Sequence, residues 1–283
     1  MAEPRPPARR RRLAATLIEL REAADKKPEE AAERIGCHRS KISRIENARL
    51  GVSLGELRDL LTFYGVEDPD QVEALVSLAR RTREPAWARR AALVRPSYTD
   101  FISYEETAAC ICSYQGSLIA GLLQTPDYAH AVISARPTDL DQTGVDAMVT
   151  ARMNRQEILN RPQPPQFRVV LSEAALRLQV GGADVMRSQL EHLAKMTEHP
   201  SVEIRVVPDR AGAHAGLTGS FVLFSFPHSS IADVVCLEHR TGTLYLESPD
   251  ETETYRLAFG SFQATALSLK DSKDLIANVR RDM

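Results

Sequence analysis

Apolar residues recur at helical spacing along the N-terminal part of the chain. The first run places its apolar residues three or four positions apart with charged residues between them: Leu13, Leu17, Leu20 and Ala24. This spacing predicts an amphipathic helix. Pro28, followed by two glutamates, favours the start of a second short helix. Gly36 can take a positive φ directly after that helix and so predicts a tight turn.

Three more helices are predicted after this turn. Between Arg39 and Glu46, the isoleucines at 42 and 45 face one way, while the polar residues between them face outward. Ser53 and Glu56 have the spacing of a capping box, which predicts a fourth helix. Pro69 opens a fifth, with apolar positions from Val72 to Ala79.

The pattern changes in the second half of the chain. Helical stretches are predicted around Phe101–Leu123, Pro126–Ala135 and Val145–Asn160. After the proline-rich break at 161–165, short β-branched runs suggest a β-α-β unit followed by further strands: 167–171, 202–207, 220–226, 234–238 and 243–246. From Pro249 to the end, the pattern is helical again.

These elements predict an α+β protein of two domains. The N-terminal domain is all-α with five helices, and the C-terminal domain is mixed α/β with a sheet of about five strands. The predicted boundaries are a flexible basic arm at 1–12, a helical domain at 13–84, a linker at 85–100 that contains Trp87, and a C-terminal domain at 101–283. The arm combines prolines with arginines and has too few large apolar side chains to fold alone.

The distribution of charge points to one end of the chain as a binder of polyanions. The net charge is only -2. Residues 1–95 hold 20 Lys+Arg against 15 Asp+Glu, a net of +5, and the remaining residues hold 16 against 23, a net of -7. The basic N-terminal part is therefore the candidate for binding nucleic acid.

A helix-turn-helix rests its first helix against the phosphate backbone and places its second in the major groove. The predicted helix 39–46 fits the second role, because its outward side chains are polar donors: Arg39, Ser40, Ser43 and Arg44, with Lys41 beside them. Arginine can pair bidentately with guanine. His38 and Asn47 stand at the two ends of the helix, where polar groups can reach phosphates. A merely solvated charged face is the alternative interpretation.

The segment EEAAERIGCHRSKISRIENARL from Glu29, followed by SLGELRDLLTFYGV from Ser53, resembles the Xre, or lambda-repressor-like, class of helix-turn-helix regulators. The resemblance implies base contacts by Arg39, Ser40, Ser43 and Arg44. It also implies backbone contacts by Asn47 and Arg49, and the protein is then expected to bind double-stranded DNA.

The segments YQGSLIAGLLQTPDYAHAV from Tyr114 and VVPDRAGAHAGLTGSFVLFSF from Val206 are similar to the C-terminal domain of actinobacterial Xre-type regulators, the WhiJ-like group. That resemblance implies a small acidic partner protein encoded nearby and a role in developmental or antibiotic control. It also leaves open an antitoxin-like interaction module that neutralises this partner and binds DNA only for autoregulation.

Other chemistry has weaker support. Cys110 and Cys112 form a lone C-x-C without the further ligands of a zinc site, so we expect buried helix thiols and no metal or cofactor. No catalytic motif is present, and no enzyme activity is expected. A ligand pocket between the Gly181-Gly182 turn and the glycine-rich loop around His214 is an open hypothesis.

The chain has no apolar run long enough to span a bilayer and no signal-peptide pattern, which predicts a cytoplasmic protein. Because one recognition helix binds weakly, we expect a homodimer that reads paired half-sites. Its C-terminal domain is then expected to dimerise and to sense a small molecule or a small protein.

Overall fold

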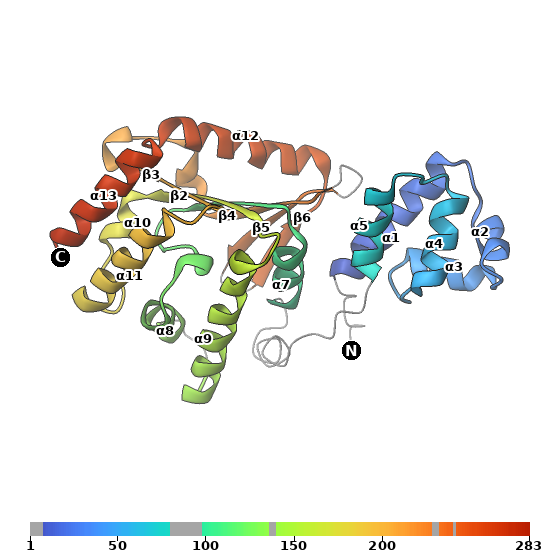
Figure 1. Cartoon of the computed structure of the whole chain (residues 1–283), viewed down its shortest axis with the longest axis horizontal. Coiled ribbons are helices and arrows are strands. Elements are labelled where there is room, and N and C mark those ends of the chain that lie inside the picture. The colour runs from blue at the N-terminus through green and yellow to red at the C-terminus, as the bar shows by residue number, and fades with distance from the viewer. Residues whose placement is uncertain (1–7, 80–97, 136–139, 228–231, 240–241) are drawn as a thin grey trace. The chain divides into compact units, whose positions relative to one another are not determined.

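The computed structural model describes residues 8–79, 98–135, 140–227, 232–239 and 242–283 (Figure 1). Within these ranges the chain divides into two compact units. One holds helices α1 to α5, and the other holds the remaining helices and a six-stranded mixed sheet. The predicted α+β fold with a helical N-terminal domain is confirmed, and the sheet has six strands instead of about five.

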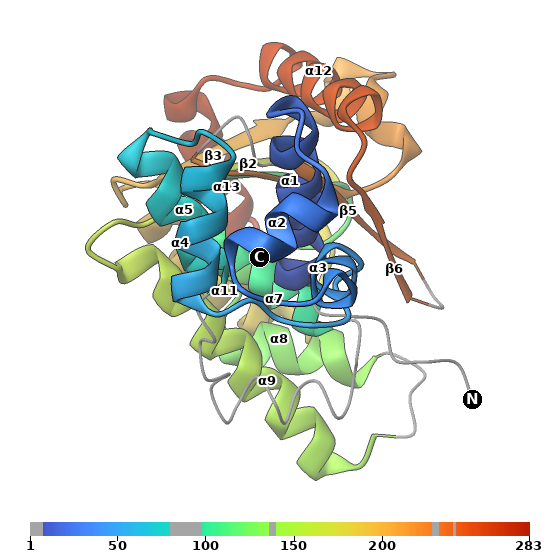
Figure 2. The same ribbon diagram turned by 90° about the vertical axis from the view of Figure 1, so that its right-hand side faces the viewer.

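The helical unit follows the predicted order closely: α1 (Ala8–Ala23), α2 (Pro28–Arg34), α3 (Arg39–Glu46), α4 (Leu54–Phe63) and α5 (Pro69–Ala79). Figure 2 shows these helices in a view turned from that of Figure 1. Their apolar faces meet in one core, in which Leu17, Ile42, Leu57 and Leu75 are almost completely buried. This shared core fixes the orientation of each helix, since none of these short helices is stable alone.

The first predicted boundaries need correction. Helix α1 begins at Ala8, so residues 8–12 of the expected arm are helical. Arginine and alanine are strong helix formers, and no proline lies between Pro7 and Pro28, so the helix extends backward through the arginine run. Likewise α7 begins at Tyr98, inside the expected linker. Residues 1–7 and 85–97, with Trp87, lie outside the described ranges.

The second unit is built from alternating helices and strands. Its helices are α7 (Tyr98–Thr107), α8 (Pro126–Ser134), α9 (Gln142–Gln156), α10 (Glu173–Arg177), α11 (Ala183–Met196), α12 (Pro249–Thr265) and α13 (Leu269–Arg281). Its strands are β1 (Cys110–Gln115), β2 (Gln166–Ser172), β3 (Val202–Val207), β4 (Phe221–Ser225), β5 (Val234–His239) and β6 (Gly242–Leu246). Short 3-10 helices are η1 (Gly121–Leu123), η2 (Glu157–Asn160), η3 (Asp209–Ala211) and η4 (Ala215–Thr218).

The strand order is β3-β2-β1-β4-β5-β6. Strands β1, β2 and β3 pair in parallel, and β2 and β3 are joined through α11, as the predicted β-α-β unit requires. The pairs β1 to β4, β4 to β5 and β5 to β6 are antiparallel. β1 is therefore the strand at which the parallel and antiparallel halves of the sheet meet.

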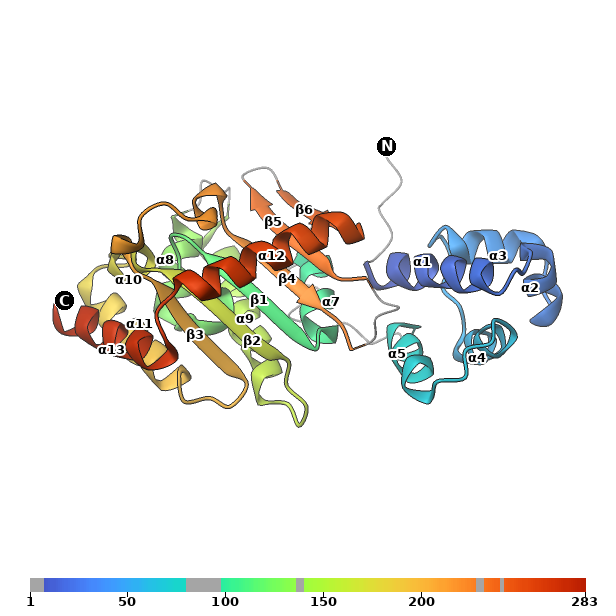
Figure 3. The ribbon, with the colours of Figure 1, turned by 90° about the horizontal axis from the view of Figure 1, so that it is seen from above.

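Helices cover both faces of the sheet. Helix α12 lies across one face and contacts β1, β3, β4 and β5, as Figure 3 shows. On the other face lie α7, α8 and α9, visible below the sheet in Figure 1. Phe101 and Tyr104 of α7 pack against Phe224 of β4 with ring centroids 5.3 and 5.9 Å apart. Each strand residue therefore belongs either to the α12 face or to the face of α7 and α9.

The predicted helical stretch Phe101–Leu123 was wrong in its middle, because β1 lies there. The strand is buried on both faces and paired on both sides, so it lacks the polar alternation that marks a half-exposed strand. Tertiary pairing with β2 and β4 decides its conformation. As a result Cys110 and Cys112 are strand residues, not helix residues.

Candidate nucleic-acid interface

The start of α3 is set by a turn and a cap. Gly36 has φ +63°, and the N–H of Cys37 donates to the carbonyl of Ala32, which closes the end of α2. His38 is the N-cap, and its Nδ1 accepts the backbone N–H of Ser40 at 3.3 Å. The same nitrogen lies 3.0 Å from the Ser40 hydroxyl. The turn and the cap by His38 thus fix where α3 begins and how its first residues are oriented.

The inner face of α3 is fixed to the rest of the unit. Ile42 and Ile45 are buried, as predicted from their spacing. At the end of the helix, Glu46 forms an ion pair with Arg21 of α1 at 2.7 Å. Only 11% of each of the two side chains is exposed. Arg21 also donates to the carbonyl of Lys26. Hydrogen bonding to Glu46 raises the pKa of Arg21, so the guanidinium is charged at every physiological pH.

The outer face of α3 carries the predicted reading residues. Arg39, Ser40, Ser43 and Arg44 are all exposed, and they come from one helix of two turns. Arg39 is held 2.8 Å from Glu29 of α2, in a pair in which more than half of each side chain is exposed. Among the residues described, none pairs with the Arg44 side chain. The face is thus a cluster of donors on a firmly packed helix.

Lys41 has a different environment from its neighbours. Its ammonium forms an ion pair with Glu56 of α4. Glu56 also accepts from the backbone and hydroxyl of Ser53, which completes the predicted capping box. The hydrogen bond between them raises the pKa of Lys41 and lowers that of Glu56. Lys41 therefore ties α3 to α4, a contact that sequence spacing did not suggest.

The chain leaves α3 through a strained turn. Asn47 donates to the Ser43 carbonyl at 2.7 Å, and the N–H groups of Arg49 and Leu50 both donate to the Arg44 carbonyl. Ala48, with φ +57°, occupies the left-handed region that glycine normally takes. Asn47 and Arg49 remain exposed beside the end of the helix, where a phosphate contact is predicted.

Two ion pairs that sequence reasoning missed are central to this arrangement. Arg21 and Glu56 each pair with a residue of α3 from a different helix. Neither pair has a local signal, because the partners are separated by 25 and 15 positions. Only the packing of α1 and α4 against α3 brings them together.

The C-x-C pair lies on β1 in the second unit. The two sulfur atoms are 3.8 Å apart on the face covered by α12. The hydrogen bond from Cys112 lowers the pKa of Cys110 to about 7, while the same bond raises the pKa of Cys112. Across the described ranges no cluster of three or more His, Cys, Asp or Glu side chains could hold a metal ion.

The hypothesis of a pocket between the Gly181-Gly182 turn and the His214 loop is wrong in its first part. A hollow does lie beside His214, lined also by Tyr114, Asp209 and Ser172, but the Gly181-Gly182 turn does not line it. That turn begins α11 and packs on Ala131 of α8. Of the glycines near His214, Gly216 has a packing reason, since a Cβ there would overlap the Tyr114 ring, whereas Gly212 and Gly219 have positive φ.

Among the described residues no helix is both long enough and apolar enough to cross a bilayer.

Comparison with protein families matches both units of the chain. A helix-turn-helix domain model matches residues 12–75, which include α2, the turn at Gly36 and α3. A model described as Domain of unknown function (DUF5753) matches residues 98–278. Comparison with curated proteins and with solved structures gave no match. The second family match spans more than half of the chain, which therefore belongs to the DUF5753 family and carries, ahead of that domain, a helix-turn-helix domain typical of DNA-binding regulators.

Proposed function

We propose that this protein is a sequence-specific transcription regulator that binds DNA as a dimer and inserts α3 into the major groove. The observation that carries the proposal is the outer face of α3, on which Arg39, Ser40, Ser43 and Arg44 are exposed together. Their helix is positioned by buried isoleucines and by the pair of Arg21 with Glu46. A rigid helix with an exposed row of donors is what direct readout of base edges needs.

The ion pair that Arg39 forms on this face costs little to break when DNA binds. The exposed pair of Arg39 with Glu29 contributes at most about 1 kcal/mol, because both groups remain in water. One bidentate contact of arginine with guanine provides about 1 to 3 kcal/mol of discrimination. Arg39 can therefore exchange Glu29 for a base, and Arg44 needs no such exchange.

The flanking residues have roles at the phosphates in this proposal. His38 uses Nδ1 for the helix cap, which leaves Nε2 to donate a hydrogen bond to a phosphate oxygen of the DNA. Asn47 and Arg49 approach the backbone at the other end of α3. Lys41 forms an ion pair with Glu56, so its contribution in this proposal is longer-range electrostatic attraction to the phosphates and not a direct contact. These contacts set the register of the helix and do not read sequence.

The DUF5753 domain has the regulatory role in this proposal, and no catalysis is assigned to it. We place the protein in the cytoplasm, where the domain dimerises and senses a small ligand or a small protein. We infer dimerisation from the size of α3, because one helix of two turns buries too little surface for tight specific binding to DNA.

The test is a gel-shift at defined salt, using the DNA upstream of the protein's own gene and fragments selected from the host genome. Replacing Arg39 and Arg44 by alanine together should weaken specific binding by about a hundredfold or more, because each lost base contact costs about 1 to 3 kcal/mol. The matched control is Arg58→Ala, which removes an exposed arginine of α4 that pairs with Glu73.

The control should change affinity less than about fivefold, as expected for one charge away from the interface. An equal loss of binding free energy per arginine removed, in Arg58→Ala and in the double variant, would show that only net charge matters and would reject α3 as the helix that reads the bases. Unchanged binding in the double variant would reject it as well.

A further inference from the structure

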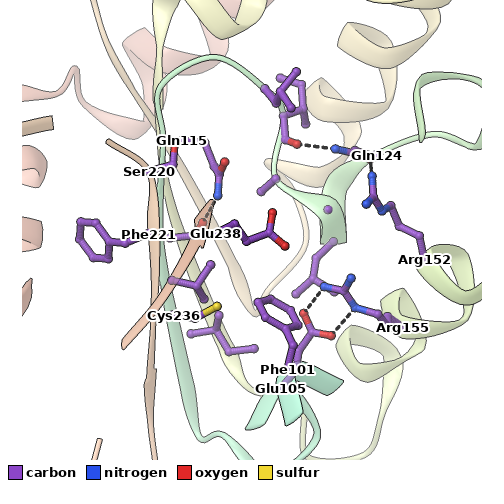
Figure 4. A pocket seen from close by; sticks show the side chains of 18 of the residues that line it. Phe101, Glu105, Gln115, Gln124, Arg152, Arg155, Ser220, Phe221, Cys236 and Glu238 are labelled. Atoms are coloured by element: carbon purple, nitrogen blue, oxygen red, sulfur yellow. Dashed lines mark hydrogen bonds and ion pairs between the residues drawn. The ribbon is translucent and has the colours of Figure 1, made fainter. Parts of the chain in front are cut away.

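The face of the sheet opposite α12 borders a partly open cavity of about 280 Å³ in the second unit. It lies alongside β1, between that strand, η1 and helices α7 and α9 (Figure 4). Ile111, Phe101 and Phe167 form part of an apolar wall. Ligand sites in proteins are typically lined by apolar and aromatic side chains with a small number of polar groups, and this cavity has both.

Six of the polar side chains that line this cavity are almost completely buried. Each of the following is at least nine-tenths buried: Tyr98, Glu105, Ser113, Gln124, Arg152 and Arg155. Arg155 donates to both oxygens of Glu105 at 2.6 and 2.7 Å, and to the Tyr98 hydroxyl. Arg152 donates to the Gln124 amide oxygen at 2.7 Å. Figure 4 shows both guanidinium groups on the same side of the cavity.

Donors exceed acceptors around Arg155. A guanidinium has five N–H bonds, and the contacts with Glu105 and Tyr98 use three of those of Arg155. The Tyr98 hydroxyl accepts from Arg155, and its own hydrogen is a further donor. A ligand with hydrogen-bond acceptors could accept from the remaining N–H bonds of Arg155 and from the Tyr98 hydroxyl. These hydrogen bonds would be strong, because polar groups interact strongly in the low dielectric of a buried site.

Gly121 leaves space where the two arginines converge. A Cβ at this glycine would lie 3.7 and 3.9 Å from the terminal nitrogens of Arg155 and 4.0 Å from Nε of Arg152. The residue is not among the glycines with positive φ, and these distances are ordinary contacts, so neither backbone strain nor a clash demands a glycine there. What the missing side chain provides is room beside two guanidinium groups.

At the opposite wall the cavity is bordered by Glu238 of β5, an exposed carboxylate that Figure 4 shows extending from the sheet side. The cavity therefore has an anion-binding end at the arginines and an apolar middle.

We propose that this cavity binds a small organic acid whose carboxylate lies beside Gly121 between Arg152 and Arg155, with an apolar ring or chain against Phe101 and Phe167. The inference rests on the ligand-sensing part of the proposed function and names the ligand class. Tyr98, Phe101 and Glu105 all belong to α7, so the ligand contacts the first helix after the helix-turn-helix domain among the residues that the structure describes.

The test is calorimetric titration of the full-length protein, without DNA, with 4-hydroxybenzoate and with the neutral amide 4-hydroxybenzamide. Wild-type protein should bind the acid and bind the amide about tenfold more weakly or worse, because the charge-assisted contact is lost. Gly121→Ala should weaken binding of the acid by about tenfold. Gly260→Ala adds the same methyl group to α12, with no atom within 4 Å, and should leave binding unchanged.

Three outcomes overturn the proposal: no binding of the acid, equal binding of acid and amide, or unchanged binding in Gly121→Ala. If Gly121→Ala does not fold by circular dichroism, Arg152→Lys replaces it, since lysine keeps the charge and loses the planar fork. That variant should also bind the acid more weakly, and unchanged binding overturns the proposal. Failure here leaves DNA binding by α3 intact, and loss of DNA binding in the arginine double variant leaves this titration unaffected.

Discussion

Two ion pairs of the helical unit show how burial decides the role of an arginine. Arg21 and Glu46 are joined at 2.7 Å with little of either side chain exposed, whereas Arg39 and Glu29 are joined at 2.8 Å largely in water. The distances are nearly equal, but only the first pair has lost most of its hydration. Removing one partner of the first pair leaves a poorly solvated charge, while the second pair can open at little cost.

Arg21→Ala should therefore destabilise the helical unit by about 2 kcal/mol, because it leaves Glu46 without its main partner. Native-state hydrogen exchange of the α1 and α3 amides measures this free energy within the full-length protein. Arg58→Ala, which breaks the exposed pair with Glu73, should change it by about 0.5 kcal/mol or less. Similar effects of the two substitutions would show that the pair with Glu46 has no special role.

At the scale of single elements, local signals predicted the helices around α3 well. The capping box at Ser53 and Glu56, the glycine after α2 and the paired isoleucines all act within a few residues, and the structure has the helix boundaries where they place them. The strand β1 carried no such signal, because both of its faces are buried and its partners lie far away in sequence.

The same distinction applies to the candidate site. Exposure of Arg39 and Arg44 could be predicted from helical periodicity alone. The pair of Lys41 with Glu56 could not, and neither could the convergence of Arg152 and Arg155 on Gly121, since both depend on how separate elements pack. Long-range side-chain geometry is therefore the part of the site that could not be predicted from the sequence.

The turn before α3 provides a prediction at the element scale. Gly36 has φ +63°, and a Cβ added to it would meet no atom within 4 Å, so Gly36→Ala is opposed by backbone strain alone and should cost about 1 kcal/mol. Gly55 lies inside α4, also in open space, and Gly55→Ala should stabilise that helix by about 0.5 to 1 kcal/mol. Hydrogen exchange of the α3 and α4 amides should show changes of opposite sign, and a gain from both substitutions would contradict the role of the turn.

At the scale of the whole molecule, residues 1–95, which include the helical unit and have a net charge of +5, are linked to a larger acidic domain. We expect the full-length protein to be a dimer through the DUF5753 domain, because one copy of α3 reads a single half-site. Sedimentation equilibrium should give twice the mass of one chain, both for the full-length protein and for a variant without the first 85 residues. Monomers in both cases would contradict this arrangement, and a dimer only in the full-length protein would move the interface to the helical unit.

Strand β1 has one more consequence, which concerns how the second domain can change during evolution. Ile111, Ser113 and Gln115 line the cavity, whereas Cys112 and Tyr114 pack beneath α12. Partners on both sides hold this register. An insertion or deletion of one residue would exchange the two sets, sending the thiol and the phenol into the cavity and the cavity lining into the core. Related proteins can thus retune this binding space by substitution, while changes in chain length must fall in the connections on either side of the strand.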